Sequence, residues 1–256
     1  MIPLKEQEAI RWKFAQELAG QVKIDFFTER EVALELPGRR PCVNCKPARL
    51  MLQELAALSD LISLRRHIFD EATEGRAQFG IERIPGIVLR GAQKGAFKFY
   101  GMPGGTQFFG FIETIVDISR GEVLLSDASV KALRKLEEDV SLRVFVTPTC
   151  PYSPQMAHMA GQLALAAPSV KAEVIVVNDF PELGERYGVR AVPLMLIADR
   201  VPIAGAVGEE VLVKQLLKAA ASPLSEPVEV SGPTTPYAPE QPAQAGEARP
   251  SGLIVP

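Results

Sequence analysis

The strongest constraint on the fold is a spacing that occurs twice along the chain. Cys42 and Pro85 are 43 positions apart, and so are Cys150 and Pro193. Each proline ends a similar string, "FGIERIP" in the first half and "YGVRAVP" in the second. In this register aromatic matches aromatic, glycine matches glycine, and two β-branched positions coincide. The chain is therefore predicted to contain two copies of one structural unit.

Each copy reads as an alternation of helices and strands. In the second copy, Ser126–Val140 is predicted to be an amphipathic helix with Ser126 as its N-cap, followed by a buried strand that ends shortly before Cys150. The order strand–helix–strand, then strand–strand–helix, predicts an α/β fold with mixed central sheets flanked by helices. The expected units are residues 1–120 and 121–221.

Two segments lie outside this repeat. Between the first strand and Cys42 the first copy has about eleven extra residues, in which Val32, Leu34 and Leu36 alternate as in a short strand or hairpin arm. Residues 222–256 are rich in Pro, Ser, Gly and Glu and contain no lysine. This composition predicts a disordered, partly extended tail, which either aids solubility or serves as a peptide ligand.

Charge and cysteine content narrow the class of protein. The net charge of -3 gives no electrostatic reason to expect nucleic acid or an anionic membrane as a partner. No run of eighteen apolar residues occurs, and the first twenty residues read as a helix rather than a signal peptide. With three cysteines, the chain has too few for a secreted disulfide framework. A cytoplasmic protein is expected, in which a C-x-x-C pair indicates catalysis or metal binding.

The three cysteines are the candidate catalytic residues. Cys42 and Cys150 are each predicted to follow a strand and open a helix, whose N-terminal N–H groups and dipole stabilise a thiolate. Cys45 is three positions after Cys42 and can close a disulfide with it, so the pair could attack a substrate disulfide and resolve the mixed disulfide. In the second copy Ser153 stands at the equivalent position, and a hydroxyl cannot form a disulfide.

Two other interpretations of the C-x-x-C pair are open. A zinc site needs about four ligands, and neither His67 nor His158 lies at a zinc-finger spacing, so no metal and no cofactor is expected. A purely structural disulfide between Cys42 and Cys45 would close a very short loop and stabilise the fold little.

Pro85 and Pro193 are predicted to be cis. Each follows a β-branched residue and begins a strand, and a cis bond would place the backbone of Ile84 or Val192 beside the thiol, where an extended substrate peptide could pair with it. The alternative is a trans proline at the start of a strand. Asp25, in "KIDFF", is a further candidate as a proton relay to the resolving thiol, or else a residue that faces solvent.

Three segments of the chain resemble those of a known family. The strings "FVTPTCPYSP", "YGVRAVP" and "FYGMPGGTQFFGFIETIVDIS" closely resemble the protein disulfide oxidoreductases of thermophilic archaea and bacteria, a glutaredoxin-like family built of two thioredoxin folds in tandem. The resemblance covers residues 1–221. It implies thiol–disulfide exchange on protein substrates and, in some members, electron transfer from a thioredoxin-reductase-like flavoprotein to a peroxiredoxin.

Carried over by position, the resemblance makes Cys42 and Cys150 the nucleophiles and Cys45 a resolving thiol. Ser153 replaces a cysteine that the family usually has, in the unit that is often the more active one. The second site is then a monothiol site, a degenerate site retained for binding and fold, or an engineered trap. In all three cases the complete redox cycle belongs to Cys42 and Cys45.

Two functions of other classes remain open. The folds could form a peptide- or partner-binding module in which the thiols are incidental. The C-x-x-S pattern also resembles monothiol glutaredoxins, which hold an iron–sulfur cluster between two subunits, although the "CPYS" interior differs from their usual sequence.

Overall fold

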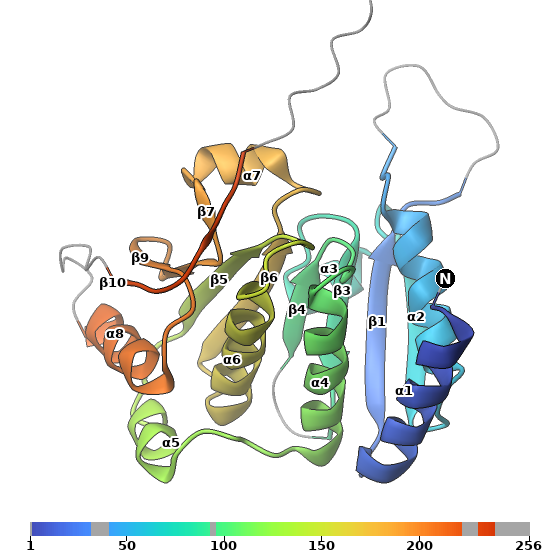
Figure 1. The fold of residues 1–256 in the computed structure, drawn as a ribbon, viewed down its shortest axis with the longest axis horizontal. Helices are drawn as coiled ribbons and strands as arrows, with labels where there is room; N and C mark the ends of the chain where they lie inside the picture. The colour runs from blue at the N-terminus through green and yellow to red at the C-terminus, as the bar shows by residue number, and fades with distance from the viewer. Residues whose placement is uncertain (1, 32–40, 93–95, 222–229, 239–256) are drawn as a thin grey trace, which may run out of the picture.

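The computed structural model describes residues 2–31, 41–92, 96–221 and 230–238 (Figure 1). The first half contains α1 (Leu4–Glu17), β1 (Val22–Thr28), α2 (Cys45–Ala56), β2 (Ile62–Ile68), α3 (Thr73–Phe79), β3 (Gly86–Arg90), β4 (Phe97–Tyr100) and α4 (Gln107–Arg120). The second contains α5 (Asp127–Leu133), β5 (Val140–Val146), α6 (Ser153–Ala166), β6 (Val170–Val176), α7 (Pro181–Arg186), β7 (Ala191–Val192), β8 (Leu194–Ile197), β9 (Val201–Ala204) and α8 (Glu209–Ala221). Two short strands follow, β10 (Val230–Ser231) and β11 (Thr235–Pro236).

The second half repeats the first down to single hydrogen bonds. The N–H of Gly101 donates to the carbonyl of Pro85 at 2.9 Å, and the N–H of Gly205 donates to the carbonyl of Pro193 at 2.7 Å. The helix before each of these prolines ends near a glycine with positive φ, 62° at Gly80 and 63° at Gly188, as is common at helix C-termini. The predicted α/β architecture of two repeated units is confirmed.

The strands of the two halves form one continuous sheet. Its order is β10-β9-β8-β5-β6-β4-β3-β1-β2, and the halves meet where β4 pairs in parallel with β6. At this junction Lys98 lies opposite Glu173, and their side chains form an ion pair at 3.4 Å. Separate sheets for the two units were the expectation, and the joined sheet was not predicted because pairing between the edge strands of two units has no local sequence signal.

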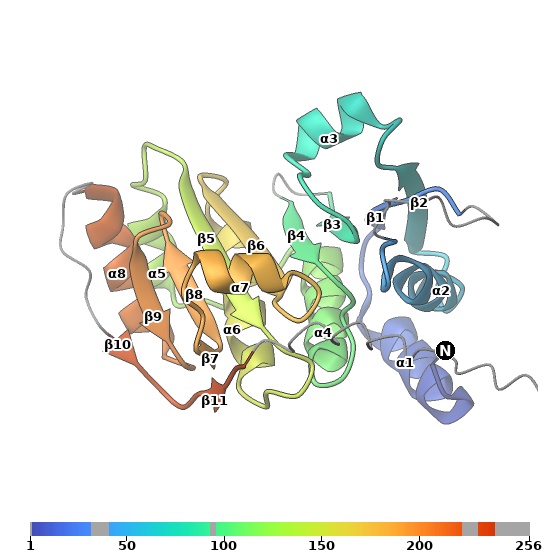
Figure 2. The same ribbon diagram turned by 90° about the horizontal axis from the view of Figure 1, so that it is seen from above.

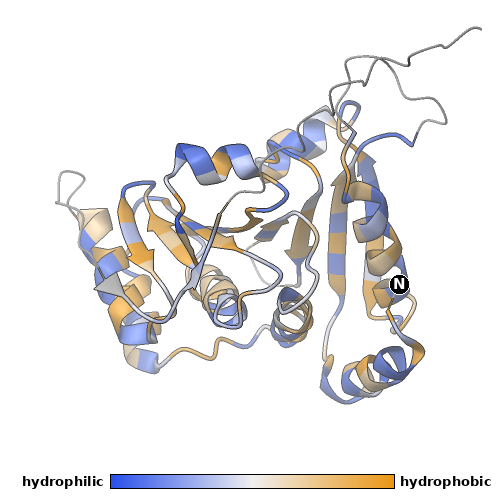
Figure 3. Cartoon of the chain, turned by 45° about the horizontal axis from the view of Figure 1, so that its top comes forward, coloured by the Kyte–Doolittle hydropathy of each residue, from blue (hydrophilic) through white to orange (hydrophobic). Residues whose placement is uncertain are grey.

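Helices cover both faces of this sheet unequally. On one face α1, α2, α4, α6 and α8 pack on a large apolar core, and on the other α3 and α7 cover a smaller one. Figure 2 shows α3 across the sheet from α1 and α2, and Figure 3 shows that most strands are hydrophobic. In β1, Phe26 faces the large core and Phe27 the small one, and both are fully buried. Each such burial stabilises the fold by about 1.5–3 kcal/mol.

The helix predicted at Ser126–Val140 is shorter than expected. Its N-cap is confirmed, because the Ser126 hydroxyl accepts a hydrogen bond from the N–H of Ser129 at 3.3 Å, but the helix ends at Leu133. Three acidic residues, 137–139, would lie at the negative end of a longer helix dipole. Val140 instead begins β5 and pairs with Val170. Strand pairing therefore overrides local helix propensity.

Part of the predicted disordered tail is structured. In residues 230–238, Val230 pairs in parallel with Ile203 of β9, Thr235 pairs antiparallel with Val192 of β7, and Tyr237 is only 9% exposed. Composition favoured disorder, but a short segment that pairs with an existing strand and buries one ring needs no core of its own. The rest of the predicted tail, and the predicted arm with Val32, lie outside the described residues.

Within the described ranges, no helix is both long enough and apolar enough to cross a membrane.

Candidate active site

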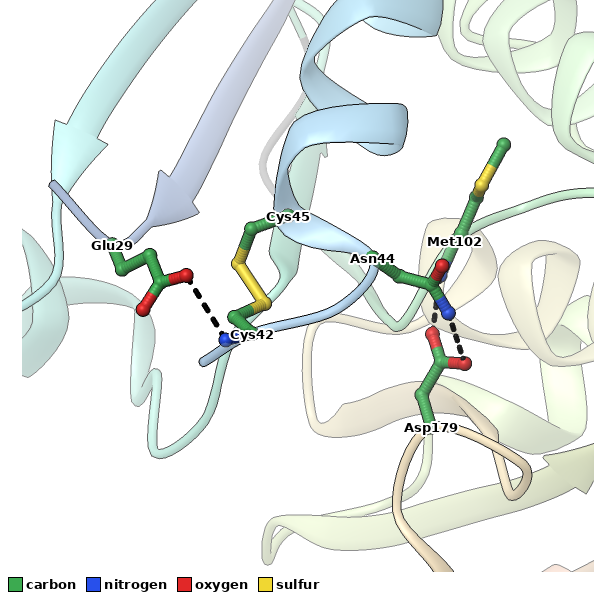
Figure 4. The surroundings of a disulfide bond; sticks show 6 residues. All are labelled: Glu29, Cys42, Asn44, Cys45, Met102 and Asp179. Atoms are coloured by element: carbon green, nitrogen blue, oxygen red, sulfur yellow. Dashed lines mark hydrogen bonds between the residues drawn. A yellow bond between two sulfur atoms is a disulfide. The ribbon is translucent and has the colours of Figure 1, made fainter. Parts of the chain in front are cut away.

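Cys42 and Cys45 form a disulfide at the start of α2 (Figure 4). Their Cα atoms are 5.4 Å apart, and the N–H of Cys45 donates to the carbonyl of Cys42 at 3.2 Å, which folds the C-x-x-C segment into a turn. Cys45 is buried, at 3% exposure, whereas Cys42 is half-buried. The predicted pairing is confirmed, and Cys42 is the sulfur that a partner can reach more easily.

One carboxylate contacts this disulfide segment at Cys42 and a second contacts it at Asn44, as Figure 4 shows. Glu29, just after β1, accepts a hydrogen bond from the N–H of Cys42 at 2.9 Å. Asp179, in the loop between β6 and α7, accepts from the Asn44 side chain at 2.7 Å and from the N–H of Met102 at 2.9 Å. Burial raises the pKa of Asp179 above its usual value, and the hydrogen bonds from Met102 and Asn44 oppose this without cancelling it.

Sequence reasoning did not identify Glu29 or Asp179. Asp179 is 134 positions after Cys45 in the other unit, and only the β4–β6 junction brings its loop to the first site. Glu29 follows β1 directly and precedes the extra residues of the first copy. Its place beside Cys42 therefore depends on the path of the chain between β1 and Cys42, which the sequence does not indicate. A carboxylate at the end of the strand before the C-x-x-C segment is the one signal that could have pointed to it.

A cavity of about 650 Å³ opens at the disulfide. It is lined by Cys42, Ile84, Pro85, Glu29, Asp70 and Asp179, among others. The Ile84–Pro85 and Val192–Pro193 bonds are both cis, as predicted. The arrangement places a redox-active sulfur and the backbone of a strand end in one open space, where an extended peptide could lie with a disulfide near Cys42.

The second site has a free and inaccessible thiol. Cys150 follows β5, is 0% exposed, and donates a hydrogen bond to the carbonyl of Val192 at 3.4 Å. Burial raises the pKa of Cys150. The nearby hydroxyls of Ser153 and Thr235 and the N–H groups of Tyr152 and Ser153 lower it, and their combined effect is larger, so the pKa of Cys150 is below its usual value.

Each site is supported by a residue from the other unit. Asp179 of the second unit holds Asn44 at the first site, and Thr106 of the first unit reaches the second. The Thr106 hydroxyl donates to the carbonyl of Cys150 at 2.8 Å, and its N–H donates to the carbonyl of Pro148 at 2.8 Å. Each site is therefore positioned in part by the interface between the two units.

The proposed relay through Asp25 is corrected by the structure. Because side chains alternate along β1, Asp25 lies on the face of Phe27, away from α2 and the disulfide. It bonds to His67 at 2.8 Å and to Arg90, and these residues line a separate cavity of about 870 Å³ beneath α3. The motif predicted an acid on β1. Side chains one position apart on a strand point to opposite faces, so Asp25 lies on the face opposite the disulfide.

His158 lies on α6, as predicted, and bonds to Asp117 of α4 rather than to Cys150. No group of three or more His, Cys, Asp and Glu side chains within the described ranges is arranged to hold a metal ion.

Comparisons with known proteins agree with this geometry. Residues 140–218 match the thioredoxin domain family. A thioredoxin from Methanocaldococcus jannaschii is 32% identical over 80 residues, which are 31% of this chain and 94% of that protein.

Two solved structures match most of the chain. The NTD_N/C domain of alkylhydroperoxide reductase AhpF from Enterococcus faecalis has a TM-score of 0.74 at 23% identity, with 84% of this chain and all of that domain covered. A protein disulfide oxidoreductase from Aeropyrum pernix has a TM-score of 0.75 at 22% identity, with 85% and 93% covered. These matches extend the likeness in fold to both units. By its sequence identity to a nearly complete thioredoxin, the chain belongs to the thioredoxin family.

Proposed function

We propose that the protein is a thiol–disulfide oxidoreductase whose catalytic cycle runs through Cys42 and Cys45. The observation that carries the proposal is the Cys42–Cys45 disulfide at the N-terminus of α2, which opens into the cavity beside Ile84 and Pro85. The family supports the same chemistry. No comparable pair exists at the second site, where Ser153 takes the place of the second thiol.

In the reducing direction the cycle has two exchange steps. The Cys42 thiolate attacks one sulfur of a substrate disulfide, a mixed disulfide forms, and the other substrate sulfur leaves as a thiolate. The Cys45 thiolate then attacks Cys42, breaks the mixed disulfide and releases the second substrate thiolate. Two electrons have passed to the substrate, and Cys42 and Cys45 are joined. Burial of Cys45 confines it to the second, intramolecular step.

The charge around Cys42 favours one class of substrate. Glu29, Asp70 and Asp179 all contribute to the cavity at the disulfide. A peptide that carries Lys or Arg near its disulfide would place positive charge beside these carboxylates, whereas an acidic peptide would be repelled. We therefore propose protein disulfides in basic segments as the preferred substrates, paired with the backbone at Ile84–Pro85.

Partners, location and unit boundaries follow from the same proposal. The matched bacterial domain is part of an alkylhydroperoxide reductase. This supports a thioredoxin-reductase-like flavoprotein as electron donor and a peroxiredoxin as acceptor. A dithiol cycle that must be re-reduced suits the cytoplasm.

The units are proposed to be residues 1–120 and 121–221, because α4 ends at Arg120 and α5 begins only at Asp127.

A redox titration tests the proposal. The variant Cys150→Ser leaves one dithiol, whose oxidised fraction is read by alkylation and mass spectrometry across defined thiol/disulfide buffers. A reversible two-electron transition between roughly -270 and -120 mV is expected, as for catalytic dithiols. A pair that never closes, or that closes only below about -300 mV, would exclude this catalytic role.

A further inference from the structure

We propose that residues 230–238 are an intramolecular ligand of a peptide groove in the second unit, and that they close this groove over Cys150. We call these residues the strap. From above, Figure 2 shows β10 beside β9 and β11 beside β7, so the strap crosses the end of the second unit. This proposal concerns a site other than Cys42–Cys45 and does not depend on the activity proposed there.

The strap pairs with the backbone at the position where an extended peptide would pair. Thr235 lies opposite Val192, the residue before cis Pro193, and the N–H of Tyr237 donates to the carbonyl of Arg190 at 2.8 Å. In an antiparallel ladder, bonding and non-bonding pairs alternate, so Pro236 falls at a position that needs no N–H. The sequence of the strap thus fits the ladder in this register.

The strap also covers the thiol. Thr235 pairs with Val192, and the carbonyl of Val192 accepts the hydrogen bond of the Cys150 thiol at 3.4 Å, so the strap lies directly beside the sulfur. Cys150 is fully buried, whereas Cys42, at the equivalent place in the first unit, is half-buried and lines an open cavity. A substrate disulfide cannot reach Cys150 while Thr235 is in place.

A pocket for an aromatic ring makes this groove selective. Tyr237 is 9% exposed and donates its hydroxyl hydrogen to the carbonyl of Val177 at 3.3 Å. Its ring packs against Gly184 of α7, where an added Cβ would lie 3.3 Å from the ring. The same Cβ would lie 2.8 Å from the Val177 side chain, so the glycine leaves room for both the ring and Val177.

The first unit has a different residue at this place. Its counterpart of Gly184 is Arg76, as matching hydrogen bonds show: Ile81 donates to the carbonyl of Arg76 at 2.9 Å, and Val189 donates to that of Gly184 at 2.8 Å. The Arg76 guanidinium lies 3.7 Å from the centre of the Phe69 ring. The ligand class of the second groove is thus an extended peptide with an aromatic residue two positions after the residue that faces the thiol, and proline is tolerated between them.

Alkylation of Cys150 tests the strap directly. With Cys42 and Cys45 oxidised, Cys150 is the one thiol left in the chain, so the rate of its reaction with iodoacetamide reports its access. Tyr237→Ala should raise this rate roughly tenfold or more, because the open state becomes more populated. Tyr237→Phe keeps the ring and should stay within about twofold of the unmodified chain.

A peptide and a cross-link give independent checks. The synthetic peptide of residues 233–238 should slow the alkylation of Tyr237→Ala, and the same peptide with alanine for tyrosine should not. The thiol introduced by Thr235→Cys should form a disulfide with Cys150 under mild oxidation. The one introduced by Pro236→Cys, on the exposed side of the same strand, should not.

The proposal is overturned if Cys150 of the unmodified chain reacts as fast as that of Tyr237→Ala, or if Thr235→Cys and Pro236→Cys cross-link equally. The cross-link also decides the matter should Tyr237→Ala fail to fold. Reduction of a protein disulfide by Cys42–Cys45 is measured separately, so a failure of the strap and a failure of the proposed function are distinguishable.

Discussion

The two units place a cysteine at the same point of the same fold, yet only one is arranged for a complete redox cycle. In the first, Cys42 has a partner thiol and faces an open, acidic cavity. In the second, Cys150 has Ser153 in place of that thiol and lies under the strap. The difference shows that this fold fixes the position of a nucleophilic sulfur. A second thiol and an open groove decide whether the site can complete a catalytic cycle.

The family match falls on the unit that lacks the dithiol. Residues 140–218 match the thioredoxin domain, whereas the first unit, with its extra residues before Cys42, joins the likeness through its fold. The core strands and helices that define the family are thus preserved where the redox pair is not. A role in binding and in support of the first site, through Asp179, would account for this.

The largest effect should come from removing the resolving thiol of the first unit. Cys45→Ser should lower the turnover of a protein disulfide by about 100-fold or more, because Cys42 remains trapped in a mixed disulfide. The measurement is reduction of the disulfide with an added thiol donor, together with mass spectrometry of the trapped adduct. Cys150→Ser is the matched control and should retain turnover within about twofold. Equal losses in the two variants would place the cycle across both units.

The next effect concerns the interface that links the units. Gly101 has φ of 99°, and an added Cβ would lie 2.7 Å from both the Asp179 carboxylate and the Val176 side chain. Gly101→Ala should therefore lower the free energy of unfolding by about 2 kcal/mol or more, measured by denaturant titration. Gly104→Ala is the control, because its Cβ would meet nothing closer than 3.9 Å, and it should be near neutral. Equal stability of the two variants would mean that the residues around Gly101 can shift to accommodate a Cβ at little cost in free energy.

A third prediction concerns restoring the missing thiol of the second unit. Ser153→Cys restores a possible dithiol with Cys150, but the strap should keep it from substrates, so turnover should change little. Combined with Tyr237→Ala, the same substitution should raise turnover by up to about twofold, because two working sites replace one. Assays with Cys42→Ser in the background isolate the new site. A fully active Ser153→Cys variant with the strap intact would show that the groove is open.

The sequence predicted the features that repeat in the two units, but not the contacts between the units. The 43-residue spacing predicted two units and both cis prolines, and the C-x-x-C motif predicted the Cys42–Cys45 pair, because these features depend on local order within one copy. The β4–β6 junction and Asp179 depend on contact between the copies, which no periodicity records. Asp25 was predicted to be a proton relay or to face solvent, but it is buried and bonded to His67. The buried ring of Tyr237 lies in a segment whose composition predicts disorder.

The smallest expected effect is on the acidity of the second thiol. Ser153 is one of the groups that lower the pKa of Cys150, so Ser153→Ala should raise that pKa. In the Tyr237→Ala background, the alkylation rate of Cys150 should then reach half its maximum at a higher pH. Near neutral pH the rate should fall, because less thiolate is present. At high pH, where both thiols are ionised, the variant should react at least as fast, because a thiolate of higher pKa is the stronger nucleophile. An unaltered midpoint would mean that Ser153 only fills space beside Cys150. A shift would mean that the Ser153 hydroxyl stabilises the Cys150 thiolate, although it cannot resolve a mixed disulfide formed there.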